Sequence, residues 1–259
     1  MTTQRRVAVT GGASGIGAAV AALFHQAGDE VIVLDVKAPA QTDYKYIAID
    51  LADPASIDAA IAELGDGIDV LANVAGVPGT FPDDTVFSIN FLGLRYLTDA
   101  VLPKVSDQGA VVNVASIAGA KFLMRMPSIH ELLATESYQA GLDWYRANKP
   151  DVPAYDFSKE AVILYTGLKG LTEFHRGVRM NSVSPGPVET PILVDFEASM
   201  GKELLDGVKT LTGRHASADD IAQAVLFLSS PEARWINGTN IYADGGVIGA
   251  SLAGLIPTA

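Results

Sequence analysis

A chain of 259 residues with a formal charge of −12 and no cysteine excludes several classes of protein. It can form neither disulfides nor thiolate metal sites, and its acidic balance argues against nucleic-acid binding, which favours basic surfaces. No apolar run reaches the roughly 18 residues of a membrane span, and residues 1–12 lack the pattern of a signal peptide, so we expect a cytoplasmic protein. The four histidines lie far apart, so we predict no metal site.

Apolar runs typical of buried parallel strands alternate with longer helical patterns along the chain. The predicted strands are residues 6–9, 31–34, 46–49, 70–76, 110–116, 178–186 and 239–246. The predicted helices are roughly residues 15–27, 54–64, 84–103, 155–175 and 217–229. This alternation predicts one α/β domain over residues 1–259, a Rossmann-type doubly wound parallel sheet of about seven strands with helices on both faces.

The sequence TGGASGIG, residues 10–17, lies between the first predicted strand and the first predicted helix. Glycines at this point allow a tight turn and let backbone amides at the helix N-terminus approach a pyrophosphate. The spacing is G-x-x-x-G-x-G rather than the commoner G-x-G-x-x-G, and a glycine cluster can also be an ordinary turn. Its position directly after the first strand favours a dinucleotide site.

Asp35 ends the second predicted strand. A carboxylate there can accept hydrogen bonds from both ribose hydroxyls of an adenosine, and it repels a 2′-phosphate. Neither Ser14 in the glycine loop nor Val36 is basic, and Lys37 follows the acid. We therefore predict NAD rather than NADP; the alternative for Asp35 is a turn residue at the end of a strand.

Residues 121–153 interrupt the alternation of strands and helices. Ser128 and Glu131 have the spacing of a capping box that opens a helix, and Gly141 and Pro150 limit its length, so we expect an ordered helical insertion. Its bulky side chains suggest an apolar wall of a substrate site. Equally, they could form the insertion's own core or a subunit contact. These side chains are Phe122, Leu123, Met124, Met126, Leu132, Leu133, Tyr138, Trp144 and Tyr145.

Tyr155 and Lys159 follow the insertion and, four positions apart, share one face of the next predicted helix. The alternative for such a pair is an ordinary solvated helix face. A free phenol titrates near pH ~10, too high for a base at neutral pH. A nearby ammonium, joined by the positive charge of an oxidised nicotinamide, is expected to lower the pKa of Tyr155. The phenolate could then accept the proton of a substrate alcohol.

Several motifs together resemble the short-chain dehydrogenase/reductase family over nearly the whole chain. They are TGGASGIG (10–17), NVAG (73–76, with Val74 where a second asparagine is common), INFLG (89–93), Ser116 at the end of the fifth strand, the Tyr155/Lys159 pair and SPGPVETP (184–191). The resemblance implies four catalytic residues: Asn90, Ser116, Tyr155 and Lys159. Ser116 would stabilise charge on the substrate oxygen and Asn90 would order a water near Lys159; the alternative for Asn90 is a structural role.

The resemblance also implies which residues bind the cofactor. Besides Tyr155 and Lys159, they are Gly11, Ser14, Gly15, Ile16, Gly17, Asp35, Asp50, Leu51, Asn73, Ala75, Gly76, Pro185, Val188 and Thr190. Val188 and Thr190 would hold the nicotinamide carboxamide, and residues 192–212 would correspond to the family's mobile substrate-binding segment.

Longer matching segments are similar to a narrower branch, the bacterial 3α-hydroxysteroid dehydrogenase/carbonyl reductases and the coniferyl-alcohol dehydrogenases, with the second closer. They are NVAGVPGT (73–80), INFLGLRYLTDAVL (89–102), VRMNSVSPGPVETPIL (178–193) and RWINGTNIYADGG (234–246). The branch implies an NAD-dependent oxidoreductase that interconverts an apolar, aromatic alcohol and its carbonyl. Alternatives are a 3α-hydroxysteroid or aromatic dihydrodiol dehydrogenase, or a non-catalytic NAD(H)-sensing protein. It also implies a homodimer or homotetramer, with contacts through the helices at 84–103 and 155–175.

Overall fold

A seven-stranded sheet forms the centre of the computed structural model, which describes residues 4–256. Its order is β3-β2-β1-β4-β5-β6-β9, and every neighbouring pair is parallel. The strands are β1 (Arg6–Thr10), β2 (Glu30–Asp35), β3 (Lys45–Ala48), β4 (Ile68–Asn73), β5 (Val105–Val114), β6 (Arg179–Pro185) and β9 (Asn240–Ala243). The predicted doubly wound sheet is confirmed. Because the chain winds outward in both directions from β1, the carboxyl ends of β1 and β4 border the crevice where such sheets bind ligands.

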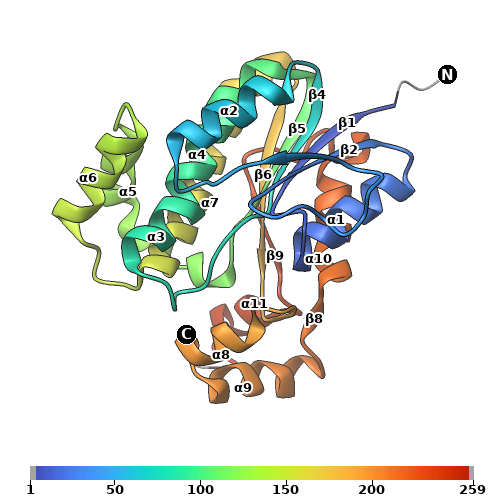
Figure 1. Ribbon diagram of the computed structural model, residues 1–259. Helices are drawn as coiled ribbons and strands as arrows, with labels where there is room; N and C mark the ends of the chain where they lie inside the picture. The colour runs from blue at the N-terminus through green and yellow to red at the C-terminus, as the bar shows by residue number, and fades with distance from the viewer. Residues whose placement is uncertain (1–3, 257–259) are drawn as a thin grey trace.

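Helices cover both faces of this sheet (Figure 1). The alternation of side chains along β1 explains the two layers: Ala8 packs into the core on one face, and Val7 and Val9 pack into the core on the other. The face of Ala8 is covered by α2 (Pro54–Leu64), α4 (Leu94–Val101) and α7 (Ala154–Glu173), and the face of Val7 by α1 (Gly15–Gln26) and α10 (Ala218–Leu228). None of the helices within residues 4–256 is long and apolar enough to cross a membrane.

The helix predicted at 84–103 is a composite of different helical geometries. It runs through α3 (Asp83–Phe87), the π-helical turn η1 (Ser88–Gly93) and α4, and ends in the 3-10 turn η2 (Leu102–Lys104). Gly93 ends the π-helical turn and lets it approach the loop after β3, because a Cβ there would lie 2.2 Å from the carbonyl oxygen of Leu51. The π-helical turn contains Asn90, and such turns occur often at functional sites.

The insertion is helical, as predicted. The 3-10 turn η3 (Ile117–Gly119) leads into it, and it contains the 3-10 turn η4 (Phe122–Arg125), α5 (Met126–Leu133) and α6 (Tyr138–Asn148). In Figure 1, α5 and α6 form a lobe outside α3 and α7. The predicted capping box is wrong: the helix begins at Met126 with Pro127 in its first turn, so Ser128 is already inside it. Gly141 does not limit a helix either, since it lies inside α6, where a Cβ would be 2.7 Å from Leu92.

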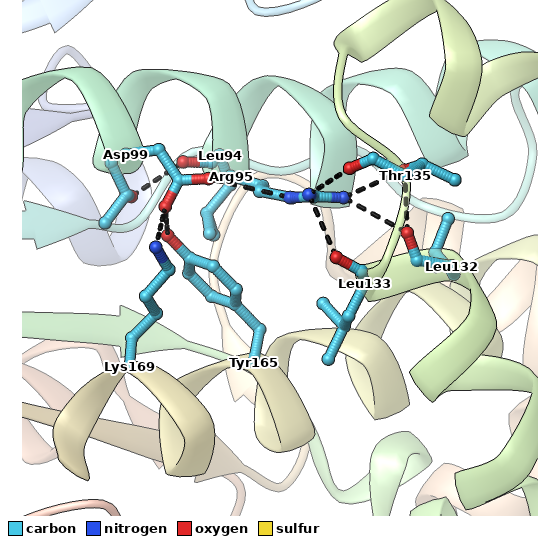
Figure 2. A network of polar contacts seen from close by, with 9 residues as sticks. Leu94, Arg95, Asp99, Leu132, Leu133, Thr135, Tyr165 and Lys169 are labelled. Carbon is cyan, nitrogen blue, oxygen red and sulfur yellow. Dashed lines mark hydrogen bonds and ion pairs between the residues drawn. The ribbon is translucent and has the colours of Figure 1, made fainter. Parts of the chain in front are cut away.

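Arg95 of α4 holds the C-terminal end of α5 (Figure 2). Its guanidinium donates hydrogen bonds to the carbonyls of Leu132 at 3.2 Å and Leu133 at 3.1 Å, and also to Thr135. A cation is favourable there because the last carbonyls of a helix lack intrahelical donors and carry partial negative charge. Arg95 also pairs with Asp99, one turn later in α4, at 3.6 Å, and Asp99 accepts a hydrogen bond from Tyr165 of α7 at 2.9 Å, so this group of polar contacts connects the insertion to both α4 and α7.

The 3-10 turn η5 (Phe174–Arg176) connects α7 to the sheet strand β6, and the remaining elements follow β6. They are the 3-10 turn η6 (Pro231–Ala233), the short strand pair β7 (Val188–Glu189) and β8 (Ala216–Ser217), and the helices α8 (Leu193–Met200), α9 (Lys202–Thr212) and α11 (Val247–Leu252). In Figure 1, α8, α9 and α11 lie together below the carboxyl end of β9. The capping box found in this part begins α10, where Ser217 and Asp220 satisfy each other's backbone amides.

Candidate active site

The glycine loop between β1 and α1 is folded so closely that side chains would not fit. Gly11 has φ +69° and donates its amide hydrogen to Leu34 O at 2.8 Å. A Cβ at Gly11 would lie 2.8 Å from Ala75 Cα, and one at Gly17 would lie 2.1 Å from the carbonyl oxygen of Gly11. The helix α1 begins directly at Gly15, so its first amides face this loop. The turn therefore has the compact backbone and the helix N-terminus that a pyrophosphate requires.

Asp35 lies beside the glycine loop at the carboxyl end of β2. One carboxylate oxygen accepts a hydrogen bond from the amide of Ala13 at 3.0 Å, and the other accepts one from the amide of Lys37 at 3.1 Å. These bonds orient the carboxylate next to the loop, where a ribose attached to the pyrophosphate would lie.

The segment after β4 approaches the same loop through its backbone. The hydroxyl of Thr10 accepts hydrogen bonds from the amides of Val74 at 2.9 Å and Ala75 at 3.1 Å. The side chain of Asn73, by contrast, points into a buried polar network, where it donates to Thr98 and Asn113, each at 2.8 Å. Among the described residues, Asn73 Oδ1 has no hydrogen-bond partner. Sequence analysis did not identify this network, because nothing in the spacing of the three residues connects them.

Asp50 and Leu51 form the turn between β3 and α2. Asp50 accepts a hydrogen bond from the amide of Ala52 at 2.8 Å, and its own amide donates to Ser56 at 2.9 Å. Leu51 is buried, and its carbonyl lies against Gly93. The Asp50 carboxylate is thus engaged in the local turn, and Leu51 joins this turn to the π-helical segment.

Ser116, Tyr155 and Lys159 come together where β5 ends beside α7. Ser116 is the last residue before η3, and a hydrogen bond joins its side chain to Tyr155. Lys159 lies one helical turn after Tyr155; its Nζ donates to Val114 O at 3.0 Å and is 5.6 Å from the centre of the Tyr155 ring. The predicted arrangement of the tyrosine and the lysine on one helix face is confirmed.

Asn90 belongs to the same cluster through Gly76. A Cβ at Gly76 would lie 3.2 Å from Asn90 Oδ1 and 3.5 Å from Lys159 Nζ. The amide of Asn90 exchanges two hydrogen bonds with the backbone of Val77, at 2.8 and 3.0 Å. The side chain of Asn90 therefore holds the loop after β4, as the structural alternative predicts. It also lies close to Lys159.

Burial shifts the pKa values of the two central groups in opposite directions. It raises the pKa of Tyr155 to about 12, against a smaller lowering by the hydrogen bond with Ser116. It also lowers the pKa of Lys159 to about 8, because burial disfavours an ammonium as it disfavours a phenolate. The expectation that the pKa of Tyr155 lies below its ordinary value is wrong for the protein groups alone, since desolvation outweighs the hydrogen bond with Ser116 and the charge of Asp156 raises the pKa further.

The loop after β6 lies against the glycine loop. A Cβ at Gly15 would be 3.6 Å from the methyl group of Thr190, and Val188 is buried in β7. Pro185 ends β6, so the chain leaves the sheet at its carboxyl edge. Most of the predicted site residues therefore meet at one edge of the sheet, with the side chain of Asn73 and the carboxylate of Asp50 engaged elsewhere.

Most aromatic side chains of the insertion pack on the helices beneath it and join the main core, so they form neither a separate core nor an open wall. Tyr145 is buried and stacks on Phe87 with ring centres 4.0 Å apart and an interplanar angle of 13°. Trp144 stacks on Phe157 of α7 at 6.2 Å. The exposed apolar groups are instead at the start of the insertion, where Leu123 is 66% exposed and Met124 is 73% exposed.

Comparison with known proteins gives consistent matches. The family model described as short chain dehydrogenase matches residues 5–128, and the model described as Enoyl-(Acyl carrier protein) reductase matches residues 126–248. A coniferyl-alcohol dehydrogenase from Pseudomonas sp. (strain HR199 / DSM 7063) is 40% identical, covering 95% of this chain and 97% of the relative. A 3-alpha-hydroxysteroid dehydrogenase/carbonyl reductase from Comamonas testosteroni is 31% identical, covering 93% and 95%.

A solved structure agrees with these matches. The crystal structure of the 3-alpha-hydroxysteroid dehydrogenase from Pseudomonas sp. B-0831 complexed with NADH has a TM-score of 0.81 and 31% identity. It covers 98% of this chain and 100% of that one.

Proposed function

This chain belongs to the short-chain dehydrogenase/reductase family, and from that premise we propose that it is an NAD-dependent enzyme that interconverts an apolar, aromatic alcohol with its carbonyl. The alcohol is of coniferyl or benzylic type. The observation that carries the proposal is the cluster of Ser116, Tyr155 and Lys159 at the carboxyl edge of the sheet, beside the glycine loop. A protein that only senses NAD(H) would not need this cluster.

In the oxidation, the phenolate of Tyr155 accepts the proton of the substrate hydroxyl as the oxygen becomes a carbonyl. The nicotinamide, when bound, supplies the acceptor for the hydride that leaves the carbinol carbon. Ser116 donates a hydrogen bond to the same substrate oxygen, where charge develops. In the reverse direction Tyr155 returns the proton, so one residue is the base for oxidation and the acid for reduction.

The pKa values define what this mechanism requires from Lys159. With the pKa of Tyr155 at about 12, a positive charge must stand close to the phenol in the reacting complex. Lys159 can supply it while its ammonium is protonated, and the oxidised nicotinamide carries the second positive charge. Nζ already donates to Val114 O, which holds it near Tyr155 and leaves further donors for a ribose hydroxyl.

NAD rather than NADP is proposed from the carboxylate of Asp35. Its hydrogen bonds to Ala13 and Lys37 hold it beside the glycine loop, and a 2′-phosphate there would meet a negative charge. The relative crystallised with NADH supports the same choice. A pyrophosphate fits the loop itself, because the close contacts at Gly11 and Gly17 keep its backbone compact at the N-terminus of α1.

The substrate class rests on two observations. The relative at 40% identity is named a coniferyl-alcohol dehydrogenase, and the chain exposes Leu123 and Met124 shortly after Ser116. A 3α-hydroxysteroid or a ring dihydrodiol is the second candidate, supported by the relative at 31% identity. For the assembly we propose a homodimer or homotetramer in the cytoplasm; α5 and α6 lie beside α7, so any contact through α7 would have to accommodate the insertion.

The first test follows reduced-nicotinamide absorbance with purified protein, using coniferyl alcohol, benzyl alcohol, a 3α-hydroxysteroid and an aromatic dihydrodiol. Each substrate is tried with NAD⁺ and, as the parallel control, with NADP⁺. We expect turnover of a coniferyl or benzylic alcohol with NAD⁺. Preferential turnover of the steroid or the dihydrodiol would select the second candidate, and faster turnover with NADP⁺ would contradict the role of Asp35.

The mechanism is tested by Tyr155→Phe, which removes only the hydroxyl. We expect kcat to fall by about 10²–10⁴-fold, the usual contribution of a positioned acid or base. NAD affinity, measured by calorimetry, should stay close to wild type because the glycine loop is unchanged. The matched control is Tyr145→Phe, a buried tyrosine of the insertion, which should keep its activity. Full activity in Tyr155→Phe would show that another group transfers the proton.

A further inference from the structure

Glu160, the residue after Lys159, forms a buried ion pair with the insertion. Its side chain is fully buried and accepts two hydrogen bonds from Arg125, one of them from Nε at 2.6 Å, in the two-pronged geometry typical of arginine with a carboxylate. The side chain of Arg125 is only 13% exposed. A buried carboxylate without a partner is strongly destabilising, so Glu160 effectively determines where Arg125 lies.

Arg125 ends the turn η4 and lies beside the most exposed apolar residues of the insertion. Leu123 and Met124 precede it in this turn, and Met126, which is 39% exposed, follows it. We call residues 122–126 the wall segment. Large apolar side chains left in contact with water next to an active site indicate a surface that a ligand covers.

The stretch of residues 119–125, which contains most of the wall segment, is attached at both of its ends to neighbouring residues of α7. At one end, η3 packs so closely on the helix that a Cβ at Gly119 would lie 2.8 Å from the carbonyl carbon of Lys159. At the other end, Arg125 bonds to Glu160. The segment thus leaves the catalytic helix at Lys159 and returns to it at Glu160, which places it next to the catalytic groups.

Arg125 also connects the two ends of the insertion. Its guanidinium is 3.6 Å from the carboxylate of Asp151, which is 84% exposed, and such an exposed contact contributes little stability. The buried bond to Glu160 is therefore the main polar contact that holds the wall segment. It differs from the bonds of Arg95, which hold α5 further along the insertion.

We propose that the Arg125–Glu160 ion pair is a positioning device that fixes the wall segment against the catalytic helix, and thereby determines how well ring-bearing substrates bind beside Tyr155. Arg125 and Glu160 touch neither substrate nor cofactor in this role; they act through Leu123 and Met124. The inference rests on the proposed function, since it specifies the part of the chain that recognises the apolar substrate.

Two variants test the role of the pair. Arg125→Lys keeps the positive charge beside Glu160 but loses the two-pronged geometry. The double variant Arg125→Met/Glu160→Met replaces the pair by apolar side chains, a change that often preserves folding where removal of one partner does not. The matched control is Arg146→Met on the outer helix α6. It breaks the exposed 2.8 Å ion pair between Arg146 and Asp84 of α3.

For each variant, kcat and KM are measured with coniferyl alcohol and with the smaller benzyl alcohol, NAD affinity is measured by calorimetry, and hydrogen exchange is followed in residues 117–126. We expect the preference for coniferyl alcohol, expressed as the ratio of kcat/KM values, to fall by about tenfold through KM, as for a loosened apolar contact. Hydrogen exchange of the wall segment should accelerate. NAD affinity and the control variant should be unchanged.

Two results would overturn the proposal. If exchange in residues 117–126 stays at the wild-type rate in both variants, the ion pair does not position the segment. If exchange accelerates while the substrate preference stays the same, the segment is not the substrate wall. Failure of the proposed function is distinguishable, because the wild-type protein would then oxidise neither alcohol, while the exchange experiment would still report on the ion pair.

Discussion

The proposed cofactor side and the proposed substrate side of this site are built in different ways. On the cofactor side, backbone lies directly on backbone, as in the glycine loop, where a Cβ at Gly17 would be 2.1 Å from Gly11 O. On the substrate side, side chains from distant segments hold the insertion in place, with Tyr145 stacked on Phe87 and Arg125 bonded to Glu160. A site made by close backbone contact leaves a glycine pattern in the sequence, whereas one made by side-chain packing leaves no comparable local pattern.

The largest effect on cofactor affinity is expected where the backbone contact is closest, at Gly17. Gly17→Ala would drive a methyl group into the carbonyl of Gly11, so either the glycine loop or the start of α1 must move. We expect NAD affinity, measured by calorimetry, to fall at least about a hundredfold, equivalent to about 3 kcal/mol. The substrate side should keep its packing, because the insertion does not contact this loop through any of the bonds described above.

Gly207→Ala is the matched control, since a Cβ at this position in α9 meets nothing within 4 Å. It should bind NAD as the wild type does. If Gly17→Ala bound NAD with unchanged affinity, the close backbone contact in the glycine loop would not be needed for cofactor binding. The contrast between the two sides of the site would then be contradicted.

On the substrate side, Tyr145→Ala is expected to affect stability rather than cofactor binding. The ring is buried and stacks on Phe87, and removal of a large buried aromatic ring costs about 3–5 kcal/mol in free energy of unfolding. Urea unfolding measures this change, and Tyr145→Phe, which keeps the ring, should remain close to wild type. Under conditions where Tyr145→Ala is folded, its NAD affinity should be normal; a loss as large as that of Gly17→Ala would mean that the two halves are not separate.

The same contrast explains which features could be predicted from the sequence. All seven strands of the central sheet were predicted, because several of them, such as residues 31–34, are the consecutive apolar runs typical of buried parallel strands and the others alternate with helical patterns. The pairing of Tyr155 with Lys159 was also predictable, since the helical repeat alone puts them on one face. These features depend on residues close together in the chain.

Features that depend on distant contacts could not be predicted. The capping box proposed at Ser128 is absent because α5 follows the turn η4 directly and begins at Met126, two residues before Ser128. Arg125, the last residue of η4, is held by its bond to Glu160. The internal bonds of Asn73 depend on Thr98 and Asn113, which only the fold brings together. The raised pKa of Tyr155 likewise depends on burial, which no local pattern of residues reveals.

The smallest expected effect concerns a charge on the substrate side, Asp156, which follows Tyr155 on α7. Burial, and then repulsion from Glu160, raise its pKa from 3.8 to about 6, while Arg125 and Lys121 lower it in part. In the unfolded chain the carboxyl loses its proton near its ordinary pKa, but in the folded protein it keeps the proton up to about pH 6. The contribution of Asp156 to folding stability therefore decreases as the pH rises from about 4 to 6, and it stays reduced above that range.

Asp156→Asn removes this pH-dependent cost, so it should stabilise the protein at pH 7.5 and have a clearly smaller effect near pH 4.5, where only part of the cost has developed. Because the carboxyl is only half-buried, we expect a gain of about 1 kcal/mol at the higher pH rather than the full value of its pKa shift. Urea unfolding at the two pH values measures the difference, with Asp143→Asn on the exposed face of α6 as the control. An equal effect of Asp156→Asn at both pH values would mean that the negative charge of Asp156 does not destabilise the folded protein.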